Sequence, residues 1–251
     1  MKIATFNIWN SDRGMPLREQ QIINEIKSVD SDVLCLQEVK LEAYNKLKDQ
    51  LTDYPFNYYH ESNEECDGLA VFCKYPILTT DYNNCAIYTT YEFENKTYLV
   101  VNVHLPWDSI GKKEQFIVEI IKTIDGIKSD YALLTGDFNC SGHSSVHHFI
   151  TGQRTLLNSE TTPYWFDLAE VHAEQSNTNL EVTLDLINNP RWKGKDSAET
   201  SQRFDRIYVR DAYPKPSAQL KYFSLFGKTV DEQSEYCASD HYGVVAEIKV
   251  D

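Results

Sequence analysis

The sequence predicts an α/β protein with a layered core. Two observations support this fold class. Apolar runs with strand character alternate with stretches in which isoleucines recur at helical spacing. Several of the apolar runs also end in Asn, Glu, His or Asp, the polar residue types that enzymes use in catalysis. A rigid sheet with such residues at its strand ends presents them to a cleft.

The N-terminal part of the chain supplies the first of these elements. Residues 2–9 alternate between apolar and polar, which indicates a strand. Pro16 opens a predicted helix with an apolar face. The apolar run at residues 32–39 is predicted to be a buried strand that ends in a carboxylate. Two shorter strands follow at residues 68–72 and 85–93, and we expect the second of these at a sheet edge.

The rest of the chain continues the alternation. Four more strands are predicted, at residues 98–105, 131–139, 203–209 and 242–250. Residues 114–128 form a predicted helix with five isoleucines at helical spacing. Residues 158–202 are polar and irregular, apart from a short amphipathic stretch at 166–171. The chain therefore reads as one α/β unit with a long loop region before its last strands.

Length and composition indicate a single enzyme-sized domain. The chain has 251 residues, and sheet-rich enzymes often reach this length undivided, so we expect one domain over residues 1–251 and a monomer. Hydrophobic residues make up 41%, which excludes wholesale disorder. No leader pattern or membrane-length apolar run is visible. Cys35 and Cys73 lie in apolar runs, where reduced, buried thiols are expected. These features predict a cytoplasmic protein without membrane contact.

The charge restricts the kind of substrate. The net charge is -14 at pH 7 and the pI is about 4.9. Proteins that hold long duplex DNA through many phosphate contacts usually have a basic face, and this chain has no obvious basic run. A nucleic-acid substrate is therefore expected to be small or held locally at one end.

Six short segments carry groups suited to phosphoester hydrolysis. That reaction needs an activated water, a cation on a non-bridging oxygen and help for the leaving oxygen. Mg²⁺ takes oxygen ligands and needs only one or two carboxylates, a role that suits Glu38 and Asp240. The segments are Thr5-Phe6-Asn7, Leu36-Gln37-Glu38, Val103-His104-Leu105, Gly136-Asp137-Phe138-Asn139, Phe204-Asp205-Arg206-Ile207 and Ser239-Asp240-His241.

In this order the segments resemble the motif set of the endonuclease/exonuclease/phosphatase superfamily. The resemblance extends from Asn7 to His241, almost the whole chain. It implies a four-layered α/β/β/α sandwich and a divalent-metal-dependent phosphodiesterase, with Mg²⁺ as cofactor and Mn²⁺ as the alternative. Each segment alone has an ordinary interpretation, since Gly, Asp and Asn are turn formers. Their occurrence in the right order at the ends of separate strands favours catalysis.

The resemblance also implies a role for each polar residue. Glu38 would bind the metal, with Asn7 and Asp240 positioning metal-bound water and phosphate. His104 would hydrogen-bond the phosphoryl oxygen as charge develops on it.

The remaining residues would handle water, phosphate and protons. Asp137 would orient or deprotonate the attacking water, and Asn139 would fix the phosphate. His241 would contact the phosphate and share in proton transfer. Asp205 would orient His241, as the third member of a serine-protease triad orients its histidine.

The C-terminal motifs most resemble the 5′-tyrosyl-DNA phosphodiesterase branch, which releases a tyrosine left on a DNA 5′ end by a trapped topoisomerase. A DNA end with a 5′-tyrosyl adduct is therefore the candidate substrate. Four positions depart from that branch. Leu184 stands in place of a Trp, Phe138 replaces a Thr, and residues 104–107 read His-Leu-Pro-Trp where the branch has His-Leu-Glu-Ser.

Other functions stay open at this point. A nuclease or a small-molecule phosphoesterase of the same superfamily would need the same motifs. A non-catalytic binding protein on this fold is a further alternative, because fold does not fix function.

Three further groups of residues attract attention. Trp192, Lys193 and Lys195 belong to the most concentrated basic and aromatic patch, so we expect a grip on the substrate end. His143, His147 and His148 could bind zinc, but a solvated helix face is the preferred interpretation. Trp107, Trp165 and Tyr164 belong either to the core or to the rim of a cleft.

Overall fold

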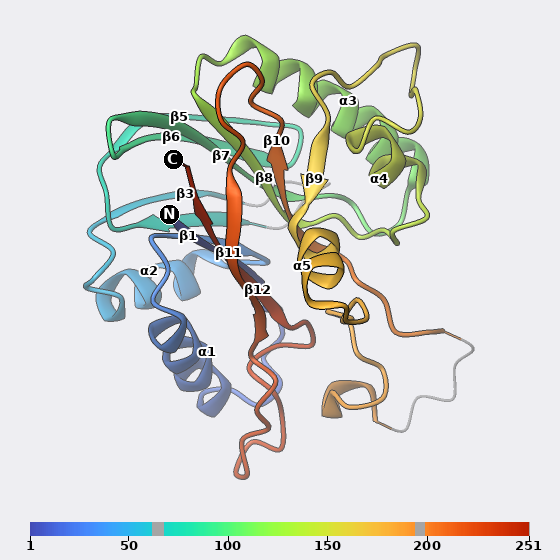
Figure 1. Ribbon diagram of the computed structural model, residues 1–251. Coiled ribbons are helices and arrows are strands. Elements are labelled where there is room, and N and C mark those ends of the chain that lie inside the picture. The colour runs from blue at the N-terminus through green and yellow to red at the C-terminus, as the bar shows by residue number, and fades with distance from the viewer. Residues whose placement is uncertain (62–67, 194–198, 251) are drawn as a thin grey trace.

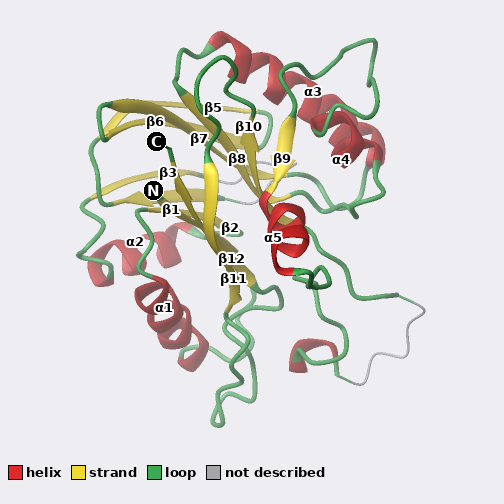
Figure 2. Ribbon diagram, in the orientation of Figure 1, coloured by secondary structure: helices red, strands yellow, loops and turns green. Residues whose placement is uncertain are grey.

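Two sheets packed face to face form the centre of the molecule (Figure 1). The computed structural model describes residues 1–61, 68–193 and 199–250, and within these residues each sheet has six strands. The strand order is β11-β12-β1-β2-β4-β3 in the first sheet and β5-β6-β7-β8-β10-β9 in the second. The molecule is therefore built on two mixed sheets, with helices on the outside (Figure 2).

The first sheet takes strands from both ends of the chain. Its strands are β1 (Lys2–Asn7), β2 (Val33–Gln37), β3 (Phe56–His60), β4 (Leu69–Cys73), β11 (Gln219–Phe226) and β12 (Gly243–Lys249). The helices α1 (Leu17–Val29) and α2 (Leu41–Gln50) cover its outer face. The isoleucines of α1 pack there against alternate residues of the strands, such as Leu34 and Leu36.

The second sheet comes from the middle of the chain. Its strands are β5 (Ile77–Asn83), β6 (Ala86–Phe93), β7 (Lys96–His104), β8 (Tyr131–Asp137), β9 (Trp165–Asp167) and β10 (Asp205–Arg210). The helices α3 (Ile110–Gly126) and α4 (Ser145–Ile150) pack on its outer face, whereas α5 (Leu168–Ser176) lies near β10 and β11. A short 3-10 helix, η1 (Pro190–Trp192), lies in the long loop before β10.

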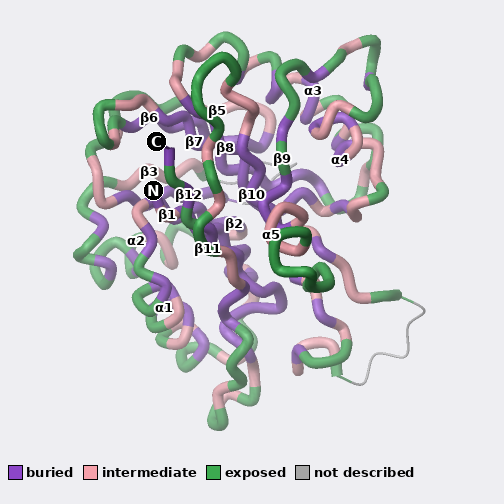
Figure 3. The backbone as a smooth tube through the Cα atoms, in the orientation of Figure 1, coloured by how far each residue is buried: buried purple, intermediate pink, exposed green. Residues whose placement is uncertain are grey.

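The two inner sheet faces share one core. Val33 and Cys35 of β2 point into it, together with Val100 of β7 and Leu133 of β8. The interior strands are therefore buried along most of their length, as the purple centre of Figure 3 shows. The four-layered α/β/β/α sandwich is confirmed.

The predictions from the sequence placed one strand wrongly and missed others. Residues 85–93 were expected at an edge, but β6 lies between β5 and β7, and β5 is the edge strand. The side chains of β5 are mostly exposed, so its pattern lacks the apolar positions that mark a strand. β3 and β11, which have few fully buried residues, escaped prediction for the same reason.

The structure confirms only part of the expectation that the cysteines are reduced. Cys35 and Cys73 are free and buried, as predicted. Cys85, however, is disulfide-bonded, which a reducing compartment does not favour. None of the helices in the described residues is long and apolar enough to cross a membrane.

Candidate active site

Strand register brings the predicted residues to one end of the sandwich. β1 and β2 are parallel, so Asn7 lies beside Gln37, and Glu38 follows directly. β7 and β8 are parallel as well, and His104 is opposite Asp137. β10 runs antiparallel to β8, which places Asp205 opposite Asp137. Residues far apart in the sequence therefore meet, because Asn7, Glu38, His104 and Asp137 lie where their strands end and Asp205 lies where the antiparallel β10 begins.

The Asn7 side chain connects the two sheets. Its Nδ2 donates to Glu38 Oε1 at 3.0 Å and to Asp137 Oδ2 at 3.0 Å. Its Oδ1 accepts a hydrogen bond from the Trp9 backbone N–H at 3.0 Å, which fixes the orientation of the amide. Asn7 is fully buried, so both carboxylates are held in register by one amide.

Two of the site residues have left-handed backbones. Glu38 has φ +56° and Asn139 has φ +47°, a region that costs energy for a non-glycine residue. Side-chain contacts hold both. Glu38 Oε2 accepts the Asn10 backbone N–H at 3.0 Å, and Asp137 Oδ1 accepts that of Asn139 at 2.8 Å. Strain of this kind concentrates at functional sites.

Asp137 lies between two histidines. His104 Nε2 is 3.7 Å and His241 Nδ1 is 3.8 Å from Asp137 Oδ2. Burial alone would raise the pKa of Asp137, but His241, His104 and the Asn7 amide together hold it below its ordinary value. Asp137 is therefore an ionised, fully buried carboxylate that can accept a proton or a hydrogen bond from water.

A close backbone approach places Asp137. The preceding residue, Gly136, has φ +137°, and a Cβ atom there would lie 2.0 Å from the Val103 carbonyl oxygen. Only glycine permits this approach of β8 to β7. The approach brings Asp137 alongside His104 at the end of both strands.

His241 is hydrogen-bonded to Asp205. The His241 Nδ1 to Asp205 Oδ2 distance is 2.8 Å. Burial opposes a charge on the imidazole, yet Asp205 and Asp137 outweigh it and raise the pKa of His241 well above its ordinary value. Burial raises the pKa of Asp205, against the attraction of His241. Thr183 Oγ1 accepts the Asp205 backbone N–H at 3.1 Å and so supports the pair from behind.

Asp240 and Glu38 fit a divalent cation. Burial, together with repulsion from Glu38, raises the pKa of Asp240 to about 6. A cation beside the two carboxylates would relieve this repulsion, and Mg²⁺ requires only one or two such ligands. Ser239 holds the segment in place, because its Oγ donates to the Asn7 carbonyl oxygen at 2.6 Å.

The structure adds a lysine that sequence reasoning missed. Lys113 is buried, and its Nζ donates to the Asn139 carbonyl oxygen at 2.6 Å. Asn139 Nδ2 in turn donates to the Leu105 carbonyl oxygen at 2.9 Å. Lys113 lies on α3, one residue before the helix predicted at residues 114–128, and no local signal distinguishes it from a solvated lysine.

The predicted substrate grip lies partly beside the site. Trp192 Nε1 donates to the Asp240 carbonyl oxygen at 3.3 Å, so the indole is near the candidate metal ligands. The Arg191 guanidinium lies 4.7 Å from the Trp192 ring centroid. Lys193 is exposed, and Lys195 lies outside the described residues. Arg191 directly precedes the three residues of the predicted grip, and the sequence does not predict its position over an aromatic ring.

The second histidine group is not a solvated face. His147 is buried, with Nδ1 2.9 Å from the Tyr208 hydroxyl oxygen, whereas His143 is exposed. The preferred interpretation was therefore wrong for His147, because a partner 61 residues away buries it. Of the aromatic residues that were left open, Trp165 belongs to the core, whereas Trp107 and Tyr164 are exposed, Trp107 at 79%.

Comparisons with known proteins agree with this geometry. The model of the Endonuclease/Exonuclease/phosphatase family matches residues 4–241. A probable CCR4-Not complex 3′-5′-exoribonuclease subunit Ccr4 from Vairimorpha ceranae is 28% identical over 227 residues, covering 70% of this chain. The chain spans about half the length of that relative, 48%.

Solved structures share the fold over the whole chain. D. rerio TDP2 in complex with a single-strand DNA product has a TM-score of 0.78 at 16% identity, covering 100% of this chain and 99% of the other. A functionally unknown conserved protein from Enterococcus faecalis has a TM-score of 0.73 at 20% identity, covering 100% of both chains. These likenesses show the fold, and the family match establishes that the chain belongs to the endonuclease/exonuclease/phosphatase family, whose members are hydrolases of phosphoester bonds.

Proposed function

We propose that the protein is a magnesium-dependent phosphodiesterase that acts at nucleic-acid ends, with the 5′-tyrosyl DNA adduct as its first candidate substrate. One observation carries the proposal. The Asn7 amide joins Glu38 to Asp137, and Asp137 lies beside both His104 and His241. A cation site, a base for water and two hydrogen-bond donors for phosphate thus belong to one network.

Glu38 and Asp240 are the residues that would hold the cation. The cation would supply Lewis acidity toward a non-bridging phosphate oxygen and lower the pKa of bound water. The protein fixes the orientation of Glu38 through Asn7 and Asn10, so this carboxylate is positioned before any ion arrives.

Asp137 would orient and deprotonate the attacking water. Its pKa is lowered, so it is ionised at neutral pH and can accept the proton. His104 and Asn139 lie on either side of it and would donate hydrogen bonds to the phosphoryl oxygens. Negative charge that develops on those oxygens would be stabilised by donors that are already in place.

His241 would contact the phosphate and share in proton transfer, while Asp205 positions it. The 2.8 Å hydrogen bond occupies Nδ1 and leaves Nε2 for the substrate. This is the arrangement of a base and its orienting carboxylate. Asp205 itself is buried behind the histidine and would not touch the substrate.

The choice of an end-processing activity follows from charge and from the patch at Trp192. An acidic chain is poorly suited to hold a long duplex, but one indole and a few cations can hold an end. The fold likeness to TDP2, including a complex with a single-strand DNA product, supports this substrate class. We propose that residues 1–251 act as one catalytic domain.

An exoribonuclease activity is the second candidate. The match to a probable Ccr4 3′-5′-exoribonuclease subunit is what favours it. Both candidates use the same hydrolytic groups and differ in the nucleic acid presented to them. A non-catalytic binding role is the alternative to both.

A substrate panel distinguishes these activities. A 5′-tyrosyl oligonucleotide, a short oligoadenylate RNA and bis-p-nitrophenyl phosphate are incubated with Mg²⁺, with Mn²⁺ or with EDTA. We expect turnover with metal and its loss in EDTA, with the tyrosyl oligonucleotide preferred. Glu38→Ala should be inactive yet folded, whereas Glu92→Ala, an exposed carboxylate on β6, should match wild type. Full activity in EDTA would refute the metal mechanism, and no turnover at all would favour a binding role.

The substrate grip has its own test. Trp192→Ala, alone and combined with Lys193→Ala and Lys195→Ala, is assayed on the tyrosyl oligonucleotide and on bis-p-nitrophenyl phosphate. Loss of a base-stacking contact costs about 1–3 kcal/mol, so we expect about a 10-fold loss or more on the oligonucleotide alone. If the variants keep wild-type activity on both substrates, the patch does not hold the substrate and is ordinary protein surface.

A further inference from the structure

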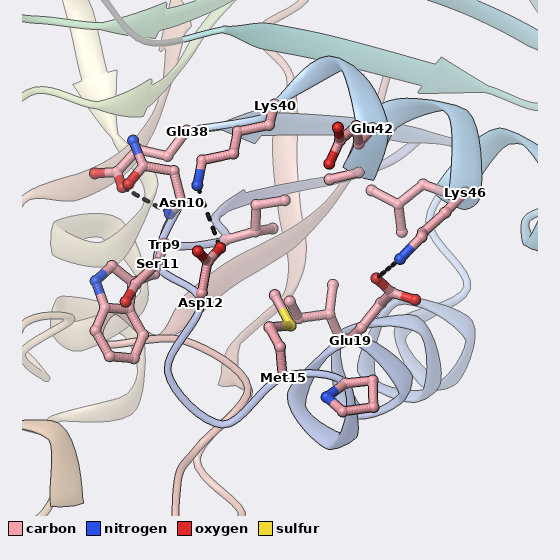
Figure 4. A pocket seen from close by; sticks show the side chains of 15 residues that line it. Trp9, Asn10, Ser11, Asp12, Met15, Glu19, Glu38, Lys40, Glu42 and Lys46 are labelled. Carbon is pink, nitrogen blue, oxygen red and sulfur yellow. Dashed lines mark hydrogen bonds and ion pairs between the residues drawn. The ribbon is translucent and has the colours of Figure 1, made fainter.

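A mostly apolar pocket lies beside Glu38, outside the hydrogen-bond network of the candidate active site (Figure 4). Its volume is about 220 Å³. Apolar cavities of about 150 Å³ are known to bind benzene, so this pocket has room for one aromatic ring. Its apolar lining comes from the loop after β1 and from α1 and α2, and consists of Ile8, Trp9, Met15, Pro16, Ile22, Ala43 and Leu47.

The pocket is adjacent to the place where the phosphate would lie. Glu38 is itself a lining residue, and so is Asn10, whose backbone N–H donates to Glu38 Oε2 at 3.0 Å. Figure 4 shows the Glu38 carboxylate at one end of the pocket and the Glu19–Lys46 ion pair at the other. A substituent on a phosphate that binds a cation held by Glu38 would therefore lie next to the Glu38 end of this pocket.

The charges around the pocket select against a second phosphate. Two ion pairs link the walls, Lys40–Asp12 at 3.4 Å and Lys46–Glu19 at 2.7 Å. Both lysines are thereby paired with acidic groups, and the lining also contains Glu38 and Glu42. The lining is acidic in total, which repels a nucleic-acid backbone. An uncharged group suits the apolar interior better.

The wall formed by Trp9 is built before any ligand binds. Trp9 has φ +55°, and its ring lies between two guanidinium groups, 4.5 Å from Arg18 and 5.2 Å from Arg191. Arg18 is fully buried and donates to the carbonyl oxygens of Ile8 and Trp9 at 2.8 and 3.0 Å. The loop that encloses the pocket is therefore fixed by a buried arginine, as expected of a preformed ligand site.

We propose that this pocket binds the uncharged aromatic ring of the group esterified to the scissile phosphate. The ring is either the phenol of an aryl ester or the base of a nucleotide. The inference rests on the proposed function, because it takes the cation held by Glu38 as the place where the phosphate binds. It assigns ring recognition to α2 and to the loop after β1, which none of the catalytic residues occupies.

Binding of small phosphate esters tests the assignment. Phenyl phosphate, thymidine 5′-phosphate and methyl phosphate are titrated calorimetrically into the protein with Mg²⁺. We expect at least one ring-bearing ester to bind about tenfold more tightly than methyl phosphate, the gain typical of burying one ring. The ester that shows the preference identifies the ring as phenol or base.

Two leucine variants on the same helix locate the ring. Ala43→Leu fills the pocket and should abolish the preference, while Asn45→Leu, an exposed position of α2 outside the lining, should retain it. Ala43→Met serves as a second filling variant if Ala43→Leu lowers the melting temperature. Equal binding of all three esters by wild type, or an unchanged preference in the filled variants, would overturn the proposal. Failure of the phosphate site itself is separate, because it would show as absent methyl phosphate binding in wild type and Asn45→Leu alike.

Discussion

Two clusters, each of one histidine and two carboxylates, make an instructive comparison, and all six residues except the half-buried Glu170 are buried. In each, the candidate ligand atoms lie within 4.8 Å of one another. We call the first the active-site cluster and the second the arginine-braced cluster. Their members are His241, Asp137 and Asp205 in the former, and His147, Asp167 and Glu170 in the latter.

Arginines make the difference between the two clusters. Arg203 Nη1 lies 2.5 Å and Arg206 Nε 3.3 Å from Asp167 Oδ2. Burial, reinforced by the charge of Arg206, lowers the pKa of His147 to about 4, so this imidazole is neutral. Among the described residues, neither carboxylate of the active-site cluster has an ion pair with an arginine, and His241 is held protonated instead. A histidine with two carboxylates thus has a protonated imidazole in one place and a neutral imidazole in the other, because arginines supply the positive charge only in the second.

The sharpest contrast comes from Asp137→Asn. The variant removes the buried charge beside both histidines and the candidate base for water. We expect turnover of bis-p-nitrophenyl phosphate to fall about 10³-fold, within the range for loss of general acid–base catalysis. Circular dichroism and a melting curve show whether the variant is folded. Near-normal turnover in a folded variant would mean that Asp137 does not act on the water.

The matching change in the braced cluster is Asp167→Asn. It leaves Arg203 and Arg206 with Glu170 as their remaining carboxylate, and breaking a buried ion pair costs about 3–5 kcal/mol. We expect the free energy of unfolding in urea to fall by about 3 kcal/mol, while the folded protein keeps most of its turnover. A large loss of turnover without loss of stability would erase the distinction between the clusters.

Asp205→Asn should have a smaller effect than Asp137→Asn. The amide preserves the shape but cannot hold the imidazolium of His241 as the carboxylate does. We expect kcat to fall about 10–100-fold, as for loss of an orienting partner. KM should change little, because Asp205 is buried behind His241. A rise in KM at constant kcat would instead place Asp205 in contact with the substrate.

The smallest effect concerns pH and His147. Its folded-state pKa of about 4 lies below the ordinary value, so the unfolded chain binds a proton that the folded chain does not. Stability is therefore lost as the pH falls through about 6.5 toward 4. Between pH 7.5 and 5 we expect wild type to lose about 1–2 kcal/mol more than His147→Gln, after allowance for solvent screening. Parallel stability curves for the two proteins would show that His147 does not contribute.

Much of the site could be predicted because its residues end apolar strands. Asn7, Glu38, His104 and Asp137 each follow a run whose burial is encoded locally. Once such strands lie side by side, their ends must meet. The predicted pair of Asp205 and His241 has the short distance it requires, although its catalytic role stays a proposal.

What escaped prediction depends on partners far along the chain. Arg18 appears in the sequence as an ordinary helical arginine, yet it is fully buried and donates to the Ala238 carbonyl oxygen 220 residues away. His147 becomes a core residue only through Tyr208. The edge strands β5 and β11 expose too many side chains to show a buried pattern. In all of these cases tertiary contacts determine whether a residue is buried, and the local periodicity of the sequence does not show such contacts.

The hydrogen bond from Ser239 to the Asn7 carbonyl oxygen determines when the candidate site can form during synthesis of the chain. It spans 232 residues and joins the first strand to the segment that precedes the last. Asn7 leaves the ribosome well before Asp240 and His241, which follow it by 233 and 234 residues. A nascent chain whose second sheet has folded therefore still lacks Asp240 and His241 of the candidate active site. The candidate site is therefore expected to form only after residues 239–241 have left the ribosome.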